Sequence, residues 1–451
     1  MRLTLVHPCI GRRRGQPYIR TWQMEPLPPA LIAGLTPPEV EVEFYDDRME
    51  AVPFDRPSDL VAISVETYTA RRAYQIASEY RRRGVPVVMG GFHASLCPDE
   101  VARHAESVVV GEAETLWAEL LDDHRAGRRR KLYRAPSRPS LRGVRPDRRI
   151  FRGKRYLPVG LVEAGRGCHL RCDFCAVQTV FGATQTRRPS DEILAEVAEV
   201  ARGSKLIFFV DDNITSNIEQ AKDLFRALIP LRVRWVSQAS IHAAHDEEFL
   251  ELLSRSGCQG VLIGFESLER DNLAAMNKSW SAMGGGFSTA LANLRRHRIR
   301  VYGTFVFGYD ADTPDSFAPA VDFARRHGFY IAAFNHLTPF PGTPLYARLS
   351  AQGRLLYDAW WLDESYAYNR IPFRPAGMAP EELERGCVDA RRSFYSWRSI
   401  LGRGLDAVNR ADAFMFRNYF MINALHRADV SGRNHFPLGE QGWAGPLLEA
   451  A

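Results

Sequence analysis

The feature that most constrains this chain is a group of three cysteines. Cys168, Cys172 and Cys175 lie in the run GRGCHLRCDFC, directly after the apolar stretch 159–162. Three thiolates can bind three irons of a cubane iron–sulfur cluster, whereas the usual full set is four. One iron is then open to another ligand, and we expect the chemistry of the protein at that iron.

A structural zinc site is the alternative for such a group. Structural zinc needs four ligands, commonly two closely spaced pairs of Cys or His. The additional candidate nearby is His169, which stands between two of the cysteines. The pattern therefore favours an iron–sulfur cluster over zinc.

Length and composition indicate more than one domain. The chain has 451 residues, of which 45% are hydrophobic, and domains typically span about 100–200 residues, so we expect two or three cores. Basic residues crowd positions 128–149 with almost no acids. Such a run is compatible with binding of nucleic acid or anionic lipid. Aromatic residues are sparse there, which favours a solvated linker between domains.

Cysteine usage points to a reducing compartment. Seven cysteines are too few and too unevenly spaced for a secreted disulfide scaffold, and three of them form a motif that needs reduced thiols. The chain begins with an apolar strand-like run instead of a signal pattern, and no segment reaches the ~18 apolar residues that span a bilayer. We expect a cytoplasmic protein without a membrane span.

Short β-rich runs alternate with helical segments such as 70–83 in the first 120 residues. This alternation predicts a parallel sheet with helices on both faces, which is a doubly wound, Rossmann-like domain. Ligands bind such sheets beyond the carboxyl ends of the strands, where we find 64–69, 90–93 and 111–114. The predicted strands are 3–6, 40–45, 60–64, 85–89 and 107–110.

A second series of strands and helices follows residue 156 and predicts a partial (β/α)6 barrel, with its chemistry at the carboxyl ends of the strands. Residues 121–155 are basic and proline-containing and are predicted to be a linker, and 351–451 a helical extension whose aromatic segment 412–426 could cover the barrel mouth. The predicted strands are 159–162, 206–210, 233–238, 260–264, 301–307 and 331–337. The predicted helices are 190–201, 216–228, 246–256, 288–297 and 313–327.

The cysteine run, with Phe174 directly before the last cysteine, resembles the C-x₃-C-x-aromatic-C motif of the radical S-adenosylmethionine (SAM) superfamily. The segments MEPLPPALIAGLTP, DLVAISVETYTARRAYQIA, VVMGGFHASLCPDE and VVVGEAE together resemble the N-terminal cobalamin-binding domain of its B12-dependent subfamily. The resemblance implies a cobalamin-type domain over 1–120 and a radical SAM barrel over 156–350. It implies a [4Fe-4S] cluster, SAM and cobalamin as cofactors, with the three cysteines as the cluster ligands.

The resemblance also implies which residues contact SAM. Asp211, Asp212 and Asn213 stand where the superfamily has a GGE-like motif that binds the SAM amino group; the alternative is a helix cap, which these residue types favour. Either Arg187 or Arg188 would pair with the SAM carboxylate, and we select Arg188; the alternative is a surface charge. The other predicted contacts are the strand-end residues Gln238, Ser240 and Glu266 and the strand glycine Gly303, for which ordinary core packing is the alternative.

Polar and glycine residues at the strand ends of the first domain are the predicted cobalamin contacts. A paired glycine after a strand lets a bulky ligand approach the backbone closely. The D-x-H-x-x-G signature that provides a lower axial histidine in B12-dependent mutases is absent, so we expect cobalamin without that ligand, and a loop or tail contact for His93. The predicted contacts are Ser64, Thr67, Gly90, Gly91, His93 and Gly111.

By this resemblance, the protein is an enzyme that transfers a methyl group from SAM, through cobalamin, to an unactivated carbon of a small-molecule or lipid-like substrate. A reducing partner such as flavodoxin or ferredoxin is implied. One alternative is a radical SAM oxidative cyclase or rearrangement enzyme without methyl transfer. Another is a non-catalytic, metal-stabilised protein that binds nucleic acid through the basic linker, which the absence of a recognisable RNA-binding module disfavours.

Overall fold

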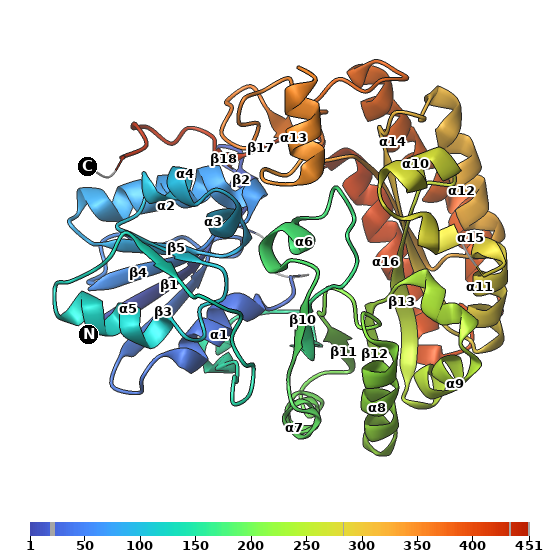
Figure 1. The fold of residues 1–451 in the computed structure, drawn as a ribbon, viewed down its shortest axis with the longest axis horizontal. Coiled ribbons are helices and arrows are strands. Elements are labelled where there is room, and N and C mark those ends of the chain that lie inside the picture. The colour runs from blue at the N-terminus through green and yellow to red at the C-terminus, as the bar shows by residue number, and fades with distance from the viewer. Residues whose placement is uncertain (19–22, 283, 433, 450–451) are drawn as a thin grey trace.

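Two six-stranded parallel sheets form the frame of the protein (Figure 1). The computed structural model describes residues 1–18, 23–282, 284–432 and 434–449. The first sheet has the order β3-β1-β4-β5-β6-β7. Its strands are β1 (Arg2–His7), β3 (Glu41–Asp46), β4 (Leu60–Ser64), β5 (Val87–Gly90), β6 (Ser107–Val110) and β7 (Leu132–Arg134).

Helices cover both faces of this sheet, because consecutive residues of its central strands are all apolar and point to opposite sides. Val87 and Met89 pack with α2 (Ala70–Arg82) and the short α3 (Phe92–Leu96) and α4 (Pro98–Ala102). Val88 packs on the other face with α1 (Leu27–Leu35) and α5 (Trp117–Arg125). The doubly wound prediction is confirmed.

The second sheet, of order β15-β14-β13-β12-β11-β8, is an open barrel with a phenylalanine-rich core. The ring centroids of Phe265 and Phe329 lie 5.2 Å apart. Its strands are β8 (Val159–Val162), β11 (Leu206–Phe209), β12 (Trp235–Gln238), β13 (Cys258–Glu266), β14 (Arg300–Phe307) and β15 (Ile331–His336). Its helices are α7 (Ser190–Val200), α8 (Ile218–Leu228), α9 (Glu247–Arg255), α10 (Arg270–Ala275), α11 (Gly286–Arg296) and α12 (Phe317–Arg326).

Two parts of the chain differ from the sequence prediction. The segment 121–155, predicted to be a linker, begins inside α5 and contains β7, which extends the first sheet because Tyr133 is buried against its core. The aromatic segment 412–426 forms most of α16 (Ala413–Gly432). Its Met415 and Tyr419 pack on Tyr330, which precedes β15, so α16 lies at the amino ends of the strands and not at the barrel mouth.

The remaining elements are short or belong to the C-terminal extension. The helices are α6 (Ala176–Phe181), α13 (Pro344–Ala351), α14 (Pro380–Phe394) and α15 (Trp397–Gly404). The strands are β2 (Gly11–Arg12), β9 (Gly165–Gly167), β10 (Gln185–Arg187), β16 (Ala367–Tyr368), β17 (Phe436–Pro437) and β18 (Gly439–Glu440). The 3₁₀ helices are η1 (Thr67–Thr69), η2 (Arg148–Phe151), η3 (Ile229–Leu231), η4 (Ile241–His245), η5 (Ser279–Ala282) and η6 (Pro314–Ser316). Within the described residues no helix is both long and apolar enough to cross a bilayer.

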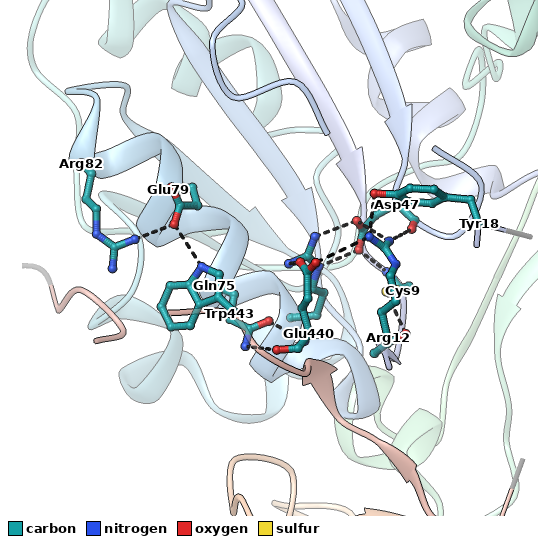
Figure 2. A network of polar contacts seen from close by, with 11 residues as sticks. Cys9, Arg12, Tyr18, Asp47, Gln75, Glu79, Arg82, Glu440 and Trp443 are labelled. Atoms are coloured by element: carbon teal, nitrogen blue, oxygen red, sulfur yellow. Dashed lines mark hydrogen bonds and ion pairs between the residues drawn. The ribbon is translucent and has the colours of Figure 1, made fainter. Parts of the chain in front are cut away.

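The C-terminal segment 439–449, which we call the strap, returns to the N-terminal domain and lies along α2 (Figures 1 and 2). β18 pairs in parallel with β2. Trp443 donates its indole N–H to Glu79 over 3.0 Å, and the backbone N–H of Leu448 donates to Ser78 over 2.9 Å. The two ends of the chain are therefore parts of one domain.

A buried ion-pair network anchors the strap, and its centre is Asp47, whose side chain is 0% exposed (Figure 2). Arg72 donates two hydrogen bonds to the Asp47 carboxylate, at 2.8 and 2.9 Å, and Arg12 adds one at 3.1 Å. Glu440 of the strap pairs with Arg72 at 2.5 Å. Burial alone would raise the pKa of Asp47, but its hydrogen bonds to Arg72 and the charge of that guanidinium outweigh burial and lower it.

Replacing Asp47 by Asn should destabilise the protein by about 3–5 kcal/mol, because Arg72 and Arg12 then lose a buried counter-charge. Urea unfolding followed by circular dichroism measures this loss. Glu364→Gln is the matched control, because Glu364 also pairs with an α2 arginine but its side chain is 88% exposed. A loss as small as the control's would contradict the role given to Asp47.

The same substitution should change the acid sensitivity of the protein. The pKa of Asp47 in the native protein lies below its ordinary value of 3.8, so its contribution to stability is present above that pH and is lost as the pH falls below it. The drop in unfolding free energy below about pH 4 should therefore be smaller in Asp47→Asn than in the unaltered protein.

Candidate functional site

The three cysteines lie on the loop that joins β9 to α6, close to the carboxyl ends of the barrel strands. Gly167, just before Cys168, has φ +94°, and a Cβ there would lie 2.3 Å from the carbonyl oxygen of Thr184, so only glycine fits. Cys172 is buried, Cys168 and Cys175 are half-buried, and all three are free thiols. This set of soft ligands on one loop suits an iron–sulfur cluster.

Asp173, within the cysteine run, holds the loop against the barrel. Its carboxylate accepts a hydrogen bond of 2.5 Å from the Tyr309 hydroxyl and one of 3.3 Å from Arg348. Its backbone N–H donates to the carbonyl of Met276 over 3.3 Å. The cysteines thus lie on a loop that is fixed from three separate segments of the chain.

Asp211, Asp212 and Asn213 follow β11 and contact the cysteine loop and the strand before it. Asp211 accepts a hydrogen bond from the backbone N–H of Ala164 at 2.7 Å, and Asp212 accepts one from that of Gly167 at 2.7 Å. The Asn213 amide lies 3.4 Å from Cys168 Sγ. The N-cap of the following helix α8 is Asn217, so these three residues do not cap it.

Complementary polar atoms beside this group are buried without a partner. Among the described residues, Asp211 Oδ2, Arg187 Nη1, Gln185 Oε1 and Thr186 Oγ1 accept or donate no hydrogen bond. Burial raises the pKa of Asp211 to about 7 and lowers that of Arg187. A carboxylate and a guanidinium held this way match the ammonium and carboxylate of an amino acid such as SAM.

Arg188 has a structural environment, unlike its neighbour Arg187. Its guanidinium pairs with Glu196 and donates to the carbonyl of Glu163 over 3.0 Å. Among the described residues, Arg187 Nη1 is buried without a hydrogen-bond partner, and the guanidinium has no ion pair. Arg188 Nε and Nη2 also lack hydrogen-bond partners, but they belong to a guanidinium that Glu196 already pairs. The geometry therefore favours Arg187 over the predicted Arg188 as the partner of a carboxylate.

The other predicted SAM contacts differ in their surroundings. Glu266, at φ +61°, accepts a hydrogen bond of 2.6 Å from the buried Lys278 ammonium. Gln238 donates to the carbonyl of Asp211 over 3.3 Å, and Ser240 accepts from Asn213 over 2.9 Å. A Cβ on Gly303 would lie 2.2 Å from the Phe329 ring, which favours the core-packing alternative for this glycine.

A cavity of about 560 Å³ lies where the first sheet faces the cysteine loop. Predicted residues of both domains line it: Ser64, Gly90, Gly91 and Gly111 at strand ends of the first sheet, and Asp212 from the barrel. Phe92 and Phe181 meet beside it, with ring centroids 5.5 Å apart. An apolar slot extends between the sheet and its helices, lined by Leu31, Ile32, Leu35, Val88 and Trp117.

Thr67 and His93 do not line this cavity. His93 is 0% exposed, its Nε2 lies 3.0 Å from Glu100 Oε1, and its Nδ1 lies 3.3 Å from Thr67 Oγ1. Both ring nitrogens of His93 therefore have partners inside the domain. This arrangement leaves neither nitrogen directed at a ligand.

Sequence reasoning did not select several charged or titratable residues of the cavity wall, among them His7, Arg48, Glu66 (within the predicted strand-end segment 64–69) and Arg166. Burial lowers the pKa of His7 to about 4, and its Nδ1 has no partner among the described residues. Burial raises the pKa of Glu66 to about 7. His7, Arg48 and Glu66 each end or follow a strand of the first sheet. That position at a strand end could have indicated them from the sequence.

Arg166 joins the two domains at the cavity. Its guanidinium pairs with Glu163 of the barrel at 2.7 Å and with Glu114 and Glu112 of the N-terminal domain at 2.8 and 3.2 Å. Arg138 adds a second bond to Glu112, at 2.8 Å. Five charged groups from three segments thereby fix the distance between the cysteine loop and the first sheet.

Comparison with known proteins places the chain in a family. Residues 162–324 match the radical SAM superfamily. The bacteriochlorophyllide d C-12(1)-methyltransferase of Chlorobaculum tepidum is 31% identical over 389 residues, which cover 84% of each chain. The protein belongs to the B12-binding radical SAM family. The protein is an enzyme, and the non-catalytic alternative is wrong, because its relatives in this family are radical SAM methyltransferases.

A second relative and a solved structure agree with this membership of the B12-binding radical SAM family. The bacteriochlorophyllide d C-8(2)-methyltransferase of the same organism is 28% identical over 83% of this chain and 86% of its own. The radical SAM methyltransferase TsrM of Kitasatospora setae, solved with cobalamin and a [4Fe-4S] cluster bound, has the same fold. Its TM-score is 0.66 at 18% identity, over 95% of this chain and 99% of that one.

A Cys172→Ala variant reconstituted without oxygen should lose most of its iron, because two thiolates do not hold a cubane cluster. The unaltered radical SAM protein should hold about four irons per chain and cleave SAM reductively, and the variant should not. Cys387→Ala is the matched control, since Cys387 is a buried free cysteine in the barrel core. Full iron content and SAM cleavage in Cys172→Ala would contradict the cluster assignment.

Proposed function

We propose that this enzyme transfers a methyl group from SAM to a poorly activated carbon of a small-molecule or lipid-like substrate, with a corrinoid bound in the cavity. One observation carries the proposal. Asp212 beside the cysteine loop and Gly90 at the end of β5 line the same cavity. A corrinoid on the first sheet would therefore face SAM and substrate across one space.

The residues near the cysteines divide into two roles in this proposal. Cys168, Cys172 and Cys175 would bind three irons and leave the fourth for SAM. Asp211 would accept hydrogen bonds from the SAM ammonium, and Arg187 would pair with its carboxylate. When bound, the cluster supplies an electron to SAM, and the corrinoid carries the methyl group.

The N-terminal domain would bind the corrinoid by shape and polarity. Ser64, Gly90, Gly91 and Gly111 leave room for a flat ring at the ends of the strands, and the apolar slot beside Trp117 suits an elongated side arm of the cofactor. His93 would not be a cobalt ligand, because both its ring nitrogens have partners.

The apolar lining of the cavity indicates the substrate class. Apolar side chains dominate the cavity lining, and the two relatives described above methylate bacteriochlorophyllides, which supports an apolar substrate. The cluster needs a one-electron donor of the flavodoxin or ferredoxin kind. Because the cysteines must stay reduced, we infer that the enzyme works in the cytoplasm.

Incubation with methyl-labelled SAM tests methyl transfer directly. The product should contain the label, and S-adenosylhomocysteine and 5′-deoxyadenosine should both form. A control incubation without corrinoid should give no labelled product, while some 5′-deoxyadenosine still forms. An unlabelled but chemically altered product would instead establish cyclisation or rearrangement.

A Gly90→Leu variant tests the place of the corrinoid. A Cβ built on residue 90 has no neighbour closer than 3.6 Å. The fold therefore tolerates the leucine side chain, which would occupy the cavity. Corrinoid affinity should fall at least about tenfold, as expected when a side chain fills a binding pocket, while iron content stays unchanged. Gly203→Leu, in an exposed turn, should bind corrinoid normally; equal binding by both variants would place the corrinoid elsewhere.

A further inference from the structure

Helix α15 exposes a stripe of large apolar side chains although it buries a charged one. Trp397, Leu401 and Leu405, the last of them the C-cap residue, recur every four residues and are 53%, 56% and 67% exposed, whereas Ile400 and Arg403 are 0% and 4% exposed. A surface helix normally buries the apolar stripe and exposes the charge. The fold therefore holds this stripe outward.

Arg403 fixes that orientation. Its guanidinium donates to the carbonyls of Phe329 and Phe394 at 2.8 and 3.1 Å and to Asn423 of α16 at 3.2 Å, and it stacks 3.7 Å from the centroid of the Phe394 ring. A buried cation with so many partners does not rotate outward without losing them. The exposed stripe is consequently a rigid feature.

Helix α16 continues the apolar surface. Met421 and Leu425 are each 40% exposed. Five of the eight large hydrophobic side chains that are exposed in the described part of the chain thus lie on these two helices. Single exposed apolar residues are ordinary, but a contiguous group marks an interaction surface.

The exposed charges of segment 397–432 all have one sign, and the exposed acid Asp389 of α14 lies beside it. The exposed charged residues of segment 397–432 are Arg398, Arg410, Arg417 and Arg427. Its acids are not exposed: Asp406 pairs with Arg295 at 2.9 Å, Asp412 pairs with Arg234 at 3.3 Å, and Asp429 is half-buried. A partner must therefore offer both negative charge and an apolar layer.

A groove of about 540 Å³ crosses this surface between the start of α15 and the end of α16. Arg392 and Arg427 line it together with Trp397, and the Arg427 guanidinium carbon lies 5.6 Å from the centroid of the Trp397 ring. Small residues form its floor: Ala424, Ala428, Val430 and Ser431. Arg392 also forms an exposed ion pair with Asp389 at 3.2 Å. A guanidinium beside an indole, with a second one that an anion can draw from this weak exposed pair, suits a phosphate group that carries an apolar chain.

We propose that the α15–α16 face, formed by Trp397, Leu401, Leu405, Met421, Leu425 and the four exposed arginines, docks on an anionic lipid bilayer. Its apolar side chains enter the boundary between headgroups and acyl chains, and its arginines contact lipid phosphates. The groove takes one headgroup.

A second copy of the chain fits this face poorly. An isologous contact would set arginines against arginines without an exposed acid from segment 397–432 to compensate. The face also lies at the amino ends of the barrel strands, since Arg403 contacts the residues that precede β15. A docked enzyme would keep its cavity, at the carboxyl ends, free.

Vesicle flotation of the full-length, cluster-loaded protein tests the proposal. It should float with vesicles of phosphatidylcholine and phosphatidylglycerol at 100 mM NaCl, bind pure phosphatidylcholine vesicles much more weakly, and detach progressively as salt increases. Equal binding to both vesicle types, or no binding to either, would overturn it. The readout does not involve methyl transfer, so the proposed function and this inference fail separately.

Variants locate the binding surface. Leu401→Ser combined with Leu405→Ser should weaken vesicle binding about tenfold or more, because two membrane-entering side chains are lost; Arg410→Glu combined with Arg417→Glu should do the same. The matched controls are Leu356→Ser, which removes an exposed leucine elsewhere, and Arg142→Glu with Arg152→Glu, which removes exposed arginines of segment 121–155. Binding that responds equally to the controls would overturn the assignment to this face.

Light scattering distinguishes lipid docking from dimerisation through the α15–α16 face. The unaltered protein and the leucine variant should have the same mass in solution, with the same iron content and SAM cleavage, since neither leucine lies near the cysteines. A dimer that the leucine variant dissociates would show that a second copy covers the face, and would overturn lipid docking.

Discussion

The position of Arg166 is the constraint on which the rest of the site depends. This guanidinium lies at the cavity, bonded to Glu163 on one side and to Glu112 and Glu114 on the other. Four charges with little access to water are stable only as a complete set, because each lost partner leaves a buried charge. The cysteine loop begins two residues later, so the same bonds that join the domains set the place of the cluster relative to the first sheet.

Much of the fold could be predicted because its strands are buried on both faces. In a parallel sheet covered by helices, each strand is an uninterrupted apolar run between turns, and the chain shows such runs almost unchanged in β4, β6 and β8. Short edge elements carry a weaker signal. β7 lies in an arginine-rich segment, and of its three residues Tyr133 is the one that packs into the core, so composition indicated a linker.

The cysteines could be read from their spacing, but the assignment of charges to partners could not. Arg187 and Arg188 are adjacent in the sequence and differ only in what the fold sets opposite them: Glu196 binds one, and the other is left without an ion pair in the described residues. Lys278 reaches Glu266 across 12 positions of the chain. Gly303 is similar: the pattern shows a glycine on a strand, and only the packed structure shows the Phe329 ring against it.

The strap has a consequence for how the protein is made. Asp47 and Arg72 precede Glu440, which completes their network, by more than 360 positions, so they leave the ribosome long before it. The nascent N-terminal domain must therefore persist with an open edge along β2 and α2 while the residues between Arg72 and Glu440 are translated. Completion of this domain waits for the strap, and a ribosome that stalls before Glu440 would release a chain whose N-terminal domain is still unfinished.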